Sequence, residues 1–474
     1  MNLNKKDIFA VIFLGLFSPL FFYNLGGFSL IDFDEAWYGE IARNIIKNHQ
    51  PFLLTFNGQP YQDHPPFGFI LIAFSFLIFG INEFSARFPS AVLGFGSTLV
   101  TYFIGKNLFN RVIGVGAGLM LVSSVWFILR SRSGNLDTIF LFFYLLTFYF
   151  AIKAKQNYKF LYPLSASFAL VLLSKSIIGV TVLVPIITLL HINRVFPKFK
   201  ILINSIAVFL IVSMPWLLIN YKFYGLEFIK HILGLGLRAE HRMMPNFLEL
   251  GSSLTFQYLH FGIREWYYPA LIALIGSLIF ILKRRLLIPL FLWTAVLLWG
   301  FLSNSKTEIW HLIPLYPILG LFIAFFLYES ASSALKILKL KKKFLTKISS
   351  SLVIVSLLGL SLKQIYEFRN EVKLFDHEKS GLAQTAKAAQ GFPEQLYLDG
   401  EFFMPQATFY SQKTVILAKS QGPPIDSLIG IVKYGPKPFL LLTELWRLET
   451  DNIDKAKYEI LSQYKGYVLI RVKN

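Results

Sequence analysis

Three acidic residues stand close together just after the first apolar segment of the chain. They are Asp32, Asp34 and Glu35, and residues 35–48 then follow the periodicity of an amphipathic helix. One face of this helix carries large apolar and aromatic side chains: Trp37, Tyr38, Ile41 and Ile45. We expect such a helix to lie on a membrane surface with Asp34 at its N-terminus. A carboxylate there can act as a general base toward a hydroxyl or an amine, or it can only cap the free backbone amides.

A second polar group, Asp63-His64-Pro65-Pro66, follows about thirty residues later. Its two prolines lack amide donors and favour an extended, rigid approach to the next helix. Asp63 and His64, held rigidly at a membrane surface, could orient a phosphate or a sugar, although an ordinary proline turn explains the same pattern. Asp34, Glu35, Asp63 and His64 together also offer oxygen and nitrogen ligands for a divalent cation, and the sequence indicates no other cofactor.

Several cations lie near the ends of apolar segments. Arg130 and Arg132 precede Asp137, Lys175 interrupts the stretch LLSKSIIG, and Lys306 stands before an apolar segment. Ionisable groups at membrane depth are costly and mark a functional pathway or a buried pair. The phosphate of a lipid carrier would explain them, because Lys and Arg bind phosphate by charge and by hydrogen bonding; snorkelling to the interface is the alternative. A further basic group forms a patch or only a solvated loop: Arg238, His241 and Arg242.

The elements that position these residues are apolar segments of membrane-spanning length. The chain has 474 residues, of which 55% are hydrophobic and 15% charged, with a mean hydropathy of +0.55. These values exclude a soluble domain, a disordered chain and a disulfide scaffold, and they indicate a polytopic membrane protein. There is no cysteine, which excludes disulfides, thiol catalysis and thiolate metal sites.

The charge pattern gives a topology. The formal net charge is +19, and most of the excess lies in six short stretches, whereas the rest of the chain is nearly neutral. These stretches fit the positive-inside rule better than a nucleic-acid surface, so no nucleic-acid partner is expected. They hold Lys5/Lys6, Lys106/Arg111, Lys153/Lys155/Lys159, Arg194/Lys198/Lys200, Lys283/Arg284/Arg285 and Lys336/Lys339/Lys341/Lys342/Lys343/Lys347.

If the basic loops lie on the inner side of the membrane, the chain crosses the membrane about eleven times. The N-terminus then lies on the inner side and the C-terminus on the outer side. The first crossing is read as an uncleaved span. The short apolar segment 67–81 is expected to lie in the outer interface as a juxtamembrane or re-entrant helix. The predicted spans are 8–24, 85–105, 112–130, 136–152, 160–174, 176–192, 201–219, 266–282, 286–302, 309–328 and 348–363.

Two domains are expected from this topology. Residues 1–363 form the transmembrane domain, in which 25–66 are the first outer loop and 220–265 the third. Residues 364–474 form a soluble outer domain with short strands between helices, because its apolar runs alternate. Those runs are QLYLDG, KTVILA, PFLLLT and GYVLIRV.

Together these motifs resemble the GT-C superfamily of membrane glycosyltransferases. The resemblance is to the branch that joins protein O-mannosyltransferases with the lipid A aminoarabinose transferases, glycosyltransferase family 39, and it covers about residues 8–320. It implies an α-helical bundle of about 11–13 transmembrane helices with juxtamembrane helices and a small α/β outer C-terminal domain. The matching motifs are Asp34-Glu35 with Tyr38, His64-Pro65-Pro66, Arg132 with Leu136-Asp137, Lys175 in LSKS, and Lys306 with LIPLYP.

The resemblance also implies an activity. The donor would be a sugar on a polyprenyl-phosphate carrier and the acceptor an envelope lipid such as lipid A, a glycan or a protein, with inversion at the anomeric carbon. The enzyme would be integral to the cytoplasmic (inner) membrane, with its active site on the extracytoplasmic face. Asp34 would be the catalytic base, together with Glu35. The substrate-binding residues would be Tyr38, Asp63, His64, Arg132, Asp137, Lys175, Lys306 and His311.

The sequence departs from the family pattern in two places. His64 stands where the aminoarabinose branch usually has lysine, and Trp310-His311 replaces an expected tyrosine. Three alternatives stay open: an oligosaccharide transferase or a ligase of a surface polysaccharide, a membrane transporter or channel, and an envelope scaffold. A transporter usually shows internal repeats, and the sequence has none.

Overall fold

A computed structural model describes most of the chain and divides it into two compact units. The helical unit comprises Met1–Tyr23, Gln62–Gly68 and Pro89–Leu374, and the sheet unit comprises Asn24–Tyr61, Phe69–Phe88 and Phe375–Asn474. The described residues are 4–31, 33–175, 177–237, 251, 253–304, 307–336, 342–400, 403–418, 428, 431–432, 438–450 and 453–473.

Every predicted span coincides with a helical segment, but several are broken. The first is divided into α1 (Lys5–Gly15) and α2 (Pro19–Phe22), because Pro19 cannot continue the hydrogen-bond ladder of α1. The third is divided into α6 (Arg111–Val122) and α7 (Val125–Ser131), which are bent by 72°. The others correspond to α5 (Glu83–Leu108), α8 (Asp137–Ala154), α9 (Leu161–Ser174), α10 (Leu183–Ile192), α11 (Phe199–Leu237), α13 (Tyr267–Ser277), α14 (Leu287–Leu302), α15 (Tyr316–Lys336) and α16 (Lys342–Phe368).

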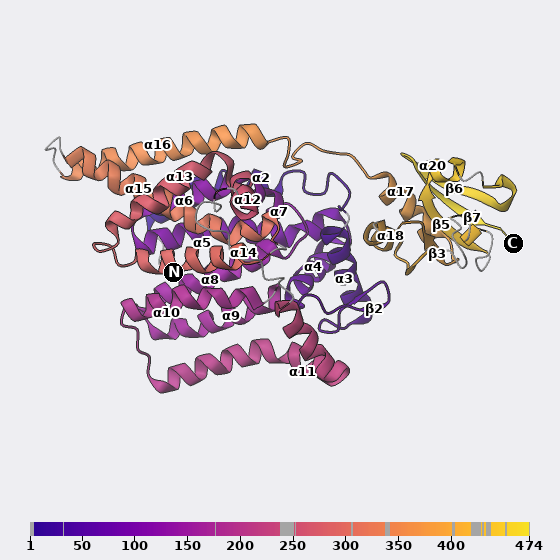
Figure 1. The fold of residues 1–474 in the computed structure, drawn as a ribbon, viewed down its shortest axis with the longest axis horizontal. Coiled ribbons are helices and arrows are strands. Elements are labelled where there is room, and N and C mark those ends of the chain that lie inside the picture. Colours follow the sequence, from indigo (N-terminus) through magenta and orange to yellow (C-terminus); the bar gives the residue numbers. More distant parts are fainter. Residues whose placement is uncertain are drawn as a thin grey trace. The chain divides into compact units, whose positions relative to one another are not determined.

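Among the described residues, five helices are long and apolar enough to cross a membrane, or six if the bent pair α6 and α7 forms one span. Four shorter apolar helical segments add to the bundle. In the helical unit, α9 packs on α8 and α11, and α15 packs on α6 (Figure 1). The predicted fold class, a polytopic helical bundle with a small sheet domain, is therefore confirmed, and the number of crossings stays a prediction.

The third outer loop differs from the prediction. Residues 220–237 continue α11, and α12 (Leu254–Ile263) lies within the same predicted loop. The helix bends instead of ending, because Gly225 adopts φ +61°, which a residue without a Cβ tolerates. The basic group Arg238, His241 and Arg242 lies outside the described residues.

The apolar segment 67–81 forms a helix, α4 (Phe67–Phe79). Its thirteen residues rise about 20 Å, less than the hydrocarbon thickness. Phe69, Ile72 and Phe76 are buried, whereas Phe74 and Leu77 are exposed. This division into a packed and an exposed apolar face supports the predicted interfacial position.

The C-terminal strands form one five-stranded sheet, drawn in yellow in Figure 1. Its order is β4-β3-β5-β7-β6, with β3 parallel to β4 and β5, and with β5, β7 and β6 antiparallel. The four strands predicted from alternating apolar runs are β3 (Leu396–Leu398), β4 (Val415–Leu417), β5 (Phe439–Glu444) and β7 (Tyr467–Val472). The fifth, β6 (Tyr458–Tyr464), escaped prediction because its sequence YEILSQY is polar and largely exposed.

Residues 25–61 of the first predicted outer loop belong to the same unit as this sheet, whereas residues 62–66 belong to the helical unit. The loop contains α3 (Asp34–Asn48) and a hairpin of β1 (Thr55–Phe56) and β2 (Gln59–Pro60). α3 packs on α18 (Met404–Ser411), and Gly39 of α3 faces the Phe409 ring at a distance that leaves no room for a Cβ. At the hairpin, the side chain of Asn57 accepts from Val415 N at 2.7 Å and donates to Val415 O at 2.9 Å.

Candidate functional site

Asp34, the candidate base, is the first residue of α3. The residue before it, Phe33, has φ +67°, a conformation that costs a side-chain-bearing residue free energy. Such a conformation persists only where the surroundings fix the backbone on both sides. The contacts of the next residue, Glu35, provide that fixation.

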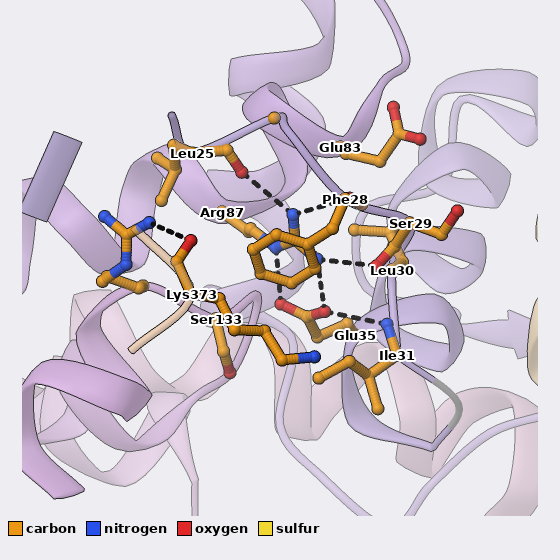
Figure 2. A network of polar contacts seen from close by, with 12 residues as sticks. Leu25, Phe28, Ser29, Leu30, Ile31, Glu35, Glu83, Arg87, Ser133 and Lys373 are labelled. Carbon is orange, nitrogen blue, oxygen red and sulfur yellow. Dashed lines mark hydrogen bonds and ion pairs between the residues drawn. The ribbon is translucent and has the colours of Figure 1, made fainter. Parts of the chain in front are cut away.

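Glu35 is buried in an ion pair with Arg87 of α5 (Figure 2). Arg87 Nε donates to Oε1 and Nη2 to Oε2, both at 2.8 Å, and Ile31 N donates to Oε2 at 2.9 Å. The remaining donors of Arg87 reach the carbonyls of Leu25, Phe28 and Ser29 at 2.9–3.0 Å. The Phe28 ring lies 3.8 Å from the guanidinium.

Every nitrogen of this guanidinium is therefore used, and both carboxylate oxygens of Glu35 accept from it. These contacts hold the first turn of α3 in position, and the catalytic and substrate-binding roles expected for Glu35 stay predictions. Arg87 had escaped notice in the sequence. The signal was available, since a lone arginine in the apolar stretch after Glu83 calls for a buried partner.

Tyr410 of α18 continues the anchoring of this segment. Its hydroxyl accepts from Leu30 N at 2.8 Å and donates to Glu83 at 3.2 Å, while Lys379 donates to Glu83 at 3.0 Å. Burial raises the pKa of the Tyr410 hydroxyl above its ordinary value, and the charge of Glu83 adds to the rise. The phenol therefore stays a neutral donor.

Tyr38 of α3 is the next of the predicted substrate-binding residues. Its side chain is buried, and its ring packs edge-on against Phe69 at 5.2 Å between centroids. The ring therefore packs α3 against α4, and its substrate-binding role stays a prediction.

In the helical unit, Asp137 lies at the start of α8 and gathers two cations. Arg130 Nη2 reaches Asp137 Oδ2 at 2.5 Å and Arg130 Nε reaches it at 2.9 Å, while Lys175 Nζ bonds to Oδ1. His311 lies within electrostatic range of the same carboxylate, and the Trp310 ring lies 5.1 Å from the Arg130 guanidinium. We call Asp137, Arg130, Lys175 and His311 the cation cluster. It brings together three of the predicted site residues, and its two permanent cations, Arg130 and Lys175, share the Asp137 carboxylate.

The turn before α8 explains this geometry. The side chain of Asn135 accepts from Asp137 N at 2.8 Å and donates to Ser133 O at 2.9 Å, so the polar turn at 133–136 directs Asp137 toward Arg130. The sequence prediction had placed Arg132 beside Asp137. Arg130 occupies that position instead.

Arg132 is a buried clamp on the backbone. Its Nε donates to Val372 O and its Nη1 to Tyr23 O, both at 2.9 Å. Longer bonds reach Leu20 O at 3.2 Å and Lys373 O at 3.3 Å. These bonds hold the backbone at 20–23 and 372–373, and the substrate role expected for Arg132 stays a prediction.

Asp63 and His64 lie at the edge of the helical unit. His64 Nδ1 is 3.3 Å from Lys175 O, beside the cation cluster, and Asp63 Oδ1 is 3.1 Å from His231 Nε2 of α11. In the described ranges, no three His, Cys, Asp or Glu side chains group suitably for a metal ion, and the cation site of Asp34, Glu35, Asp63 and His64 stays a prediction. Asp32 and Lys306 lie outside the described residues.

Comparisons with known proteins agree with this architecture. A family model described as dolichyl-phosphate-mannose-protein mannosyltransferase matches residues 63–219. An uncharacterized protein of Aquifex aeolicus is 24% identical over 68% of this chain, and the match spans 64% of that relative's length. A polyprenol-phosphate-mannose–protein mannosyltransferase of Mycobacterium tuberculosis is 33% identical over 27% of this chain and 25% of its own length.

The solved structures extend the likeness to nearly the whole chain. The crystal structure of ArnT from Cupriavidus metallidurans bound to undecaprenyl phosphate superposes with a TM-score of 0.73, covering 98% of both chains at 16% identity. The oligosaccharyltransferase of Archaeoglobus fulgidus follows with a TM-score of 0.60 at 11% identity, covering 94% of this chain and 70% of that one.

The fold is therefore that of the GT-C membrane glycosyltransferases, and the chain is an integral membrane protein. Within that class, the resemblance to the branch of protein mannosyltransferases and aminoarabinose transferases is confirmed.

Proposed function

We propose that this chain transfers a sugar from a polyprenyl-phosphate carrier to an envelope lipid, glycan or protein. The observation that carries the proposal is the cation cluster, in which two cations share one carboxylate at the start of α8. Two cations gathered in this way at the end of a membrane-spanning helix suit the phosphate of a lipid carrier. Relatives whose printed names specify polyprenyl-phosphate substrates support the same chemistry.

Lys175 and Arg130 would hold the carrier phosphate, and Asp137 would orient both cations. Lys306, predicted from the sequence, would add a further positive charge. In the reaction the bond between the anomeric carbon and the phosphate oxygen breaks, and the carrier leaves as a polyprenyl phosphate. Cations stabilise this leaving group because its negative charge grows in the transition state.

Asp34 would act as the general base. It takes the proton from an acceptor hydroxyl or amine while the acceptor oxygen or nitrogen bonds to the anomeric carbon, which inverts the configuration. The bonds of Glu35 to Arg87 and to Ile31 N support this role, because they fix the turn on which Asp34 lies. The positive-inside pattern supports an extracytoplasmic site in the inner membrane.

A comparison of envelopes tests the proposal. Cells that produce the full chain and cells that produce Asp34→Asn at equal levels are extracted, and their lipids and proteins are compared by mass spectrometry. We expect one component to carry an added sugar mass only with the intact chain. Identical envelopes, together with no consumption of an added undecaprenyl-phosphate sugar by the purified intact chain, would refute the transferase proposal.

A further inference from the structure

A second ionic group lies at the other end of α8 from Asp137. Asp7 of α1 is buried and accepts from Arg111 Nε at 2.8 Å, from Lys106 Nζ at 2.7 Å and from the Tyr102 hydroxyl at 2.9 Å. Lys153, near the C-terminal end of α8, lies within electrostatic range of Lys106. Because α8 has 18 residues, it separates this group from the cation cluster by about 27 Å, close to the hydrocarbon thickness of a bilayer.

This group has a large excess of positive charge. Lys5 and Lys6, both exposed, precede Asp7 in the first turn of α1. Two cations, Lys106 and Arg111, contact the Asp7 carboxylate directly, and three more lysines lie on the same helix ends. Glu329 of α15 does not offset these positive charges, because its carboxylate pairs with Arg284 at 2.8 Å. We call Lys5, Lys6, Lys106, Arg111 and Lys153 the basic corner.

The helix ends at this corner are already satisfied. Asn4 and Asp7 form a capping box at the start of α1, and the side chain of Asn110 accepts from Ile113 N at the start of α6. The attraction for an anion therefore comes from the side-chain cations. The end of α5 and the start of α6 approach closely, since a Cβ on Gly105 would lie 2.7 Å from the Gly114 Cα. This contact brings Lys106 and Arg111 to one carboxylate and within reach of one phosphate.

The surface beside the basic corner is apolar. The turns of α1 that follow Lys5 and Lys6 expose Ile8, Phe9 and Ile12, and Phe9 is 72% exposed. Cations at the end of a helix with exposed apolar side chains directly beyond them match an amphiphile, whose headgroup is anionic and whose chains are apolar. A free phosphate ion would use only the first of these two features.

We propose that the basic corner binds the headgroup phosphate of an anionic phospholipid, with the acyl chains lying along the exposed side chains of α1. This site is separate from the proposed carrier site, and it requires no transferase activity.

Lipid retention by the full chain tests the proposal. The purified chain is mixed in detergent with phosphatidylglycerol, with phosphatidylcholine or with inorganic phosphate, and bound molecules are counted by native mass spectrometry. The test variant is Lys5→Gln with Lys6→Gln, which leaves the buried contacts of Asp7 intact. The matched control is Lys198→Gln with Lys200→Gln, two exposed lysines of another basic stretch.

We expect retention of phosphatidylglycerol and not of phosphatidylcholine. Each neutralised charge should weaken retention about fivefold, so the test variant should lose more than tenfold while the control keeps its lipid. Lys106→Gln should lower lipid retention further, and this result counts where the melting temperature of the lipid-free chain is unchanged. If Lys106→Gln unfolds the chain, the variant with Lys5→Gln and Lys6→Gln alone decides. Equal losses in test and control variants, or binding of inorganic phosphate as tight as that of the lipid, would overturn the proposal. Neither readout depends on sugar transfer.

Discussion

Two buried groups in this chain combine arginine with a carboxylate and differ in charge balance. In the sheet unit, Arg87 meets one carboxylate and three backbone carbonyls, so all of its donors are used and the charges cancel. In the helical unit, Asp137 meets both Arg130 and Lys175, so two cations share one carboxylate. We call Arg87 with Glu35 the saturated group, because its contacts hold the backbone in place. We call Asp137 with Arg130 and Lys175 the unbalanced group, because two cations at one carboxylate favour an anionic ligand. Arg132, bonded to four carbonyls, belongs with the first kind.

The largest effect is expected on breaking the saturated group. Arg87→Met leaves the buried Glu35 carboxylate and three carbonyls without their donor, which should cost about 3–5 kcal/mol of stability. Thermal unfolding of the purified chain measures the loss. Arg130→Met is the matched control, because Asp137 keeps Lys175 and the loss should be smaller. Equal destabilisation by the two variants would remove the distinction between the groups.

The next effect concerns Asp34, the residue before Glu35. Asp34→Asn keeps the size of the side chain and removes its basicity, so transfer should fall about 10²–10⁴-fold while the melting temperature stays unchanged. Turnover of an undecaprenyl-phosphate sugar measures the change. Near-normal turnover would assign the base elsewhere.

The sequence predicted the helices and four of the five strands because hydrophobic periodicity is a local property. It predicted Asp137 and Lys175 as site residues, and the structure pairs them. It missed the pairing of Glu35 with Arg87, because 52 positions separate the two residues and no local pattern joins them. It also placed Arg132 in the site in place of Arg130, since both arginines border the same turn and only the path of the backbone decides which one meets carbonyls.

The unbalanced group should respond to substitution in binding more than in stability. Lys175→Ala removes one of two cations from Asp137, and loss of a charge-assisted contact should weaken binding of undecaprenyl phosphate about tenfold to a hundredfold. Equilibrium binding of the carrier to the detergent-solubilised chain measures this. Lys230→Ala, which removes an exposed lysine paired with Glu227, is the control and should bind normally. Equal losses in the two variants would contradict a phosphate role for the cation cluster.

The smallest effect is expected at Tyr410, which lies beside the group formed by Arg87 and Glu35. Tyr410→Phe removes the phenol that accepts from Leu30 N and donates to Glu83, and it should cost about 1–2 kcal/mol. Because burial raises the pKa of this hydroxyl, the phenol stays protonated in the folded chain above the ordinary tyrosine pKa. Its contribution is therefore complete below that ordinary value and declines only as the pH rises toward the folded value. The stability difference between Tyr410→Phe and the parent should stay constant from pH 6 to pH 9. A difference that changes across this range would show that the group around Arg87 is less saturated than its contacts indicate.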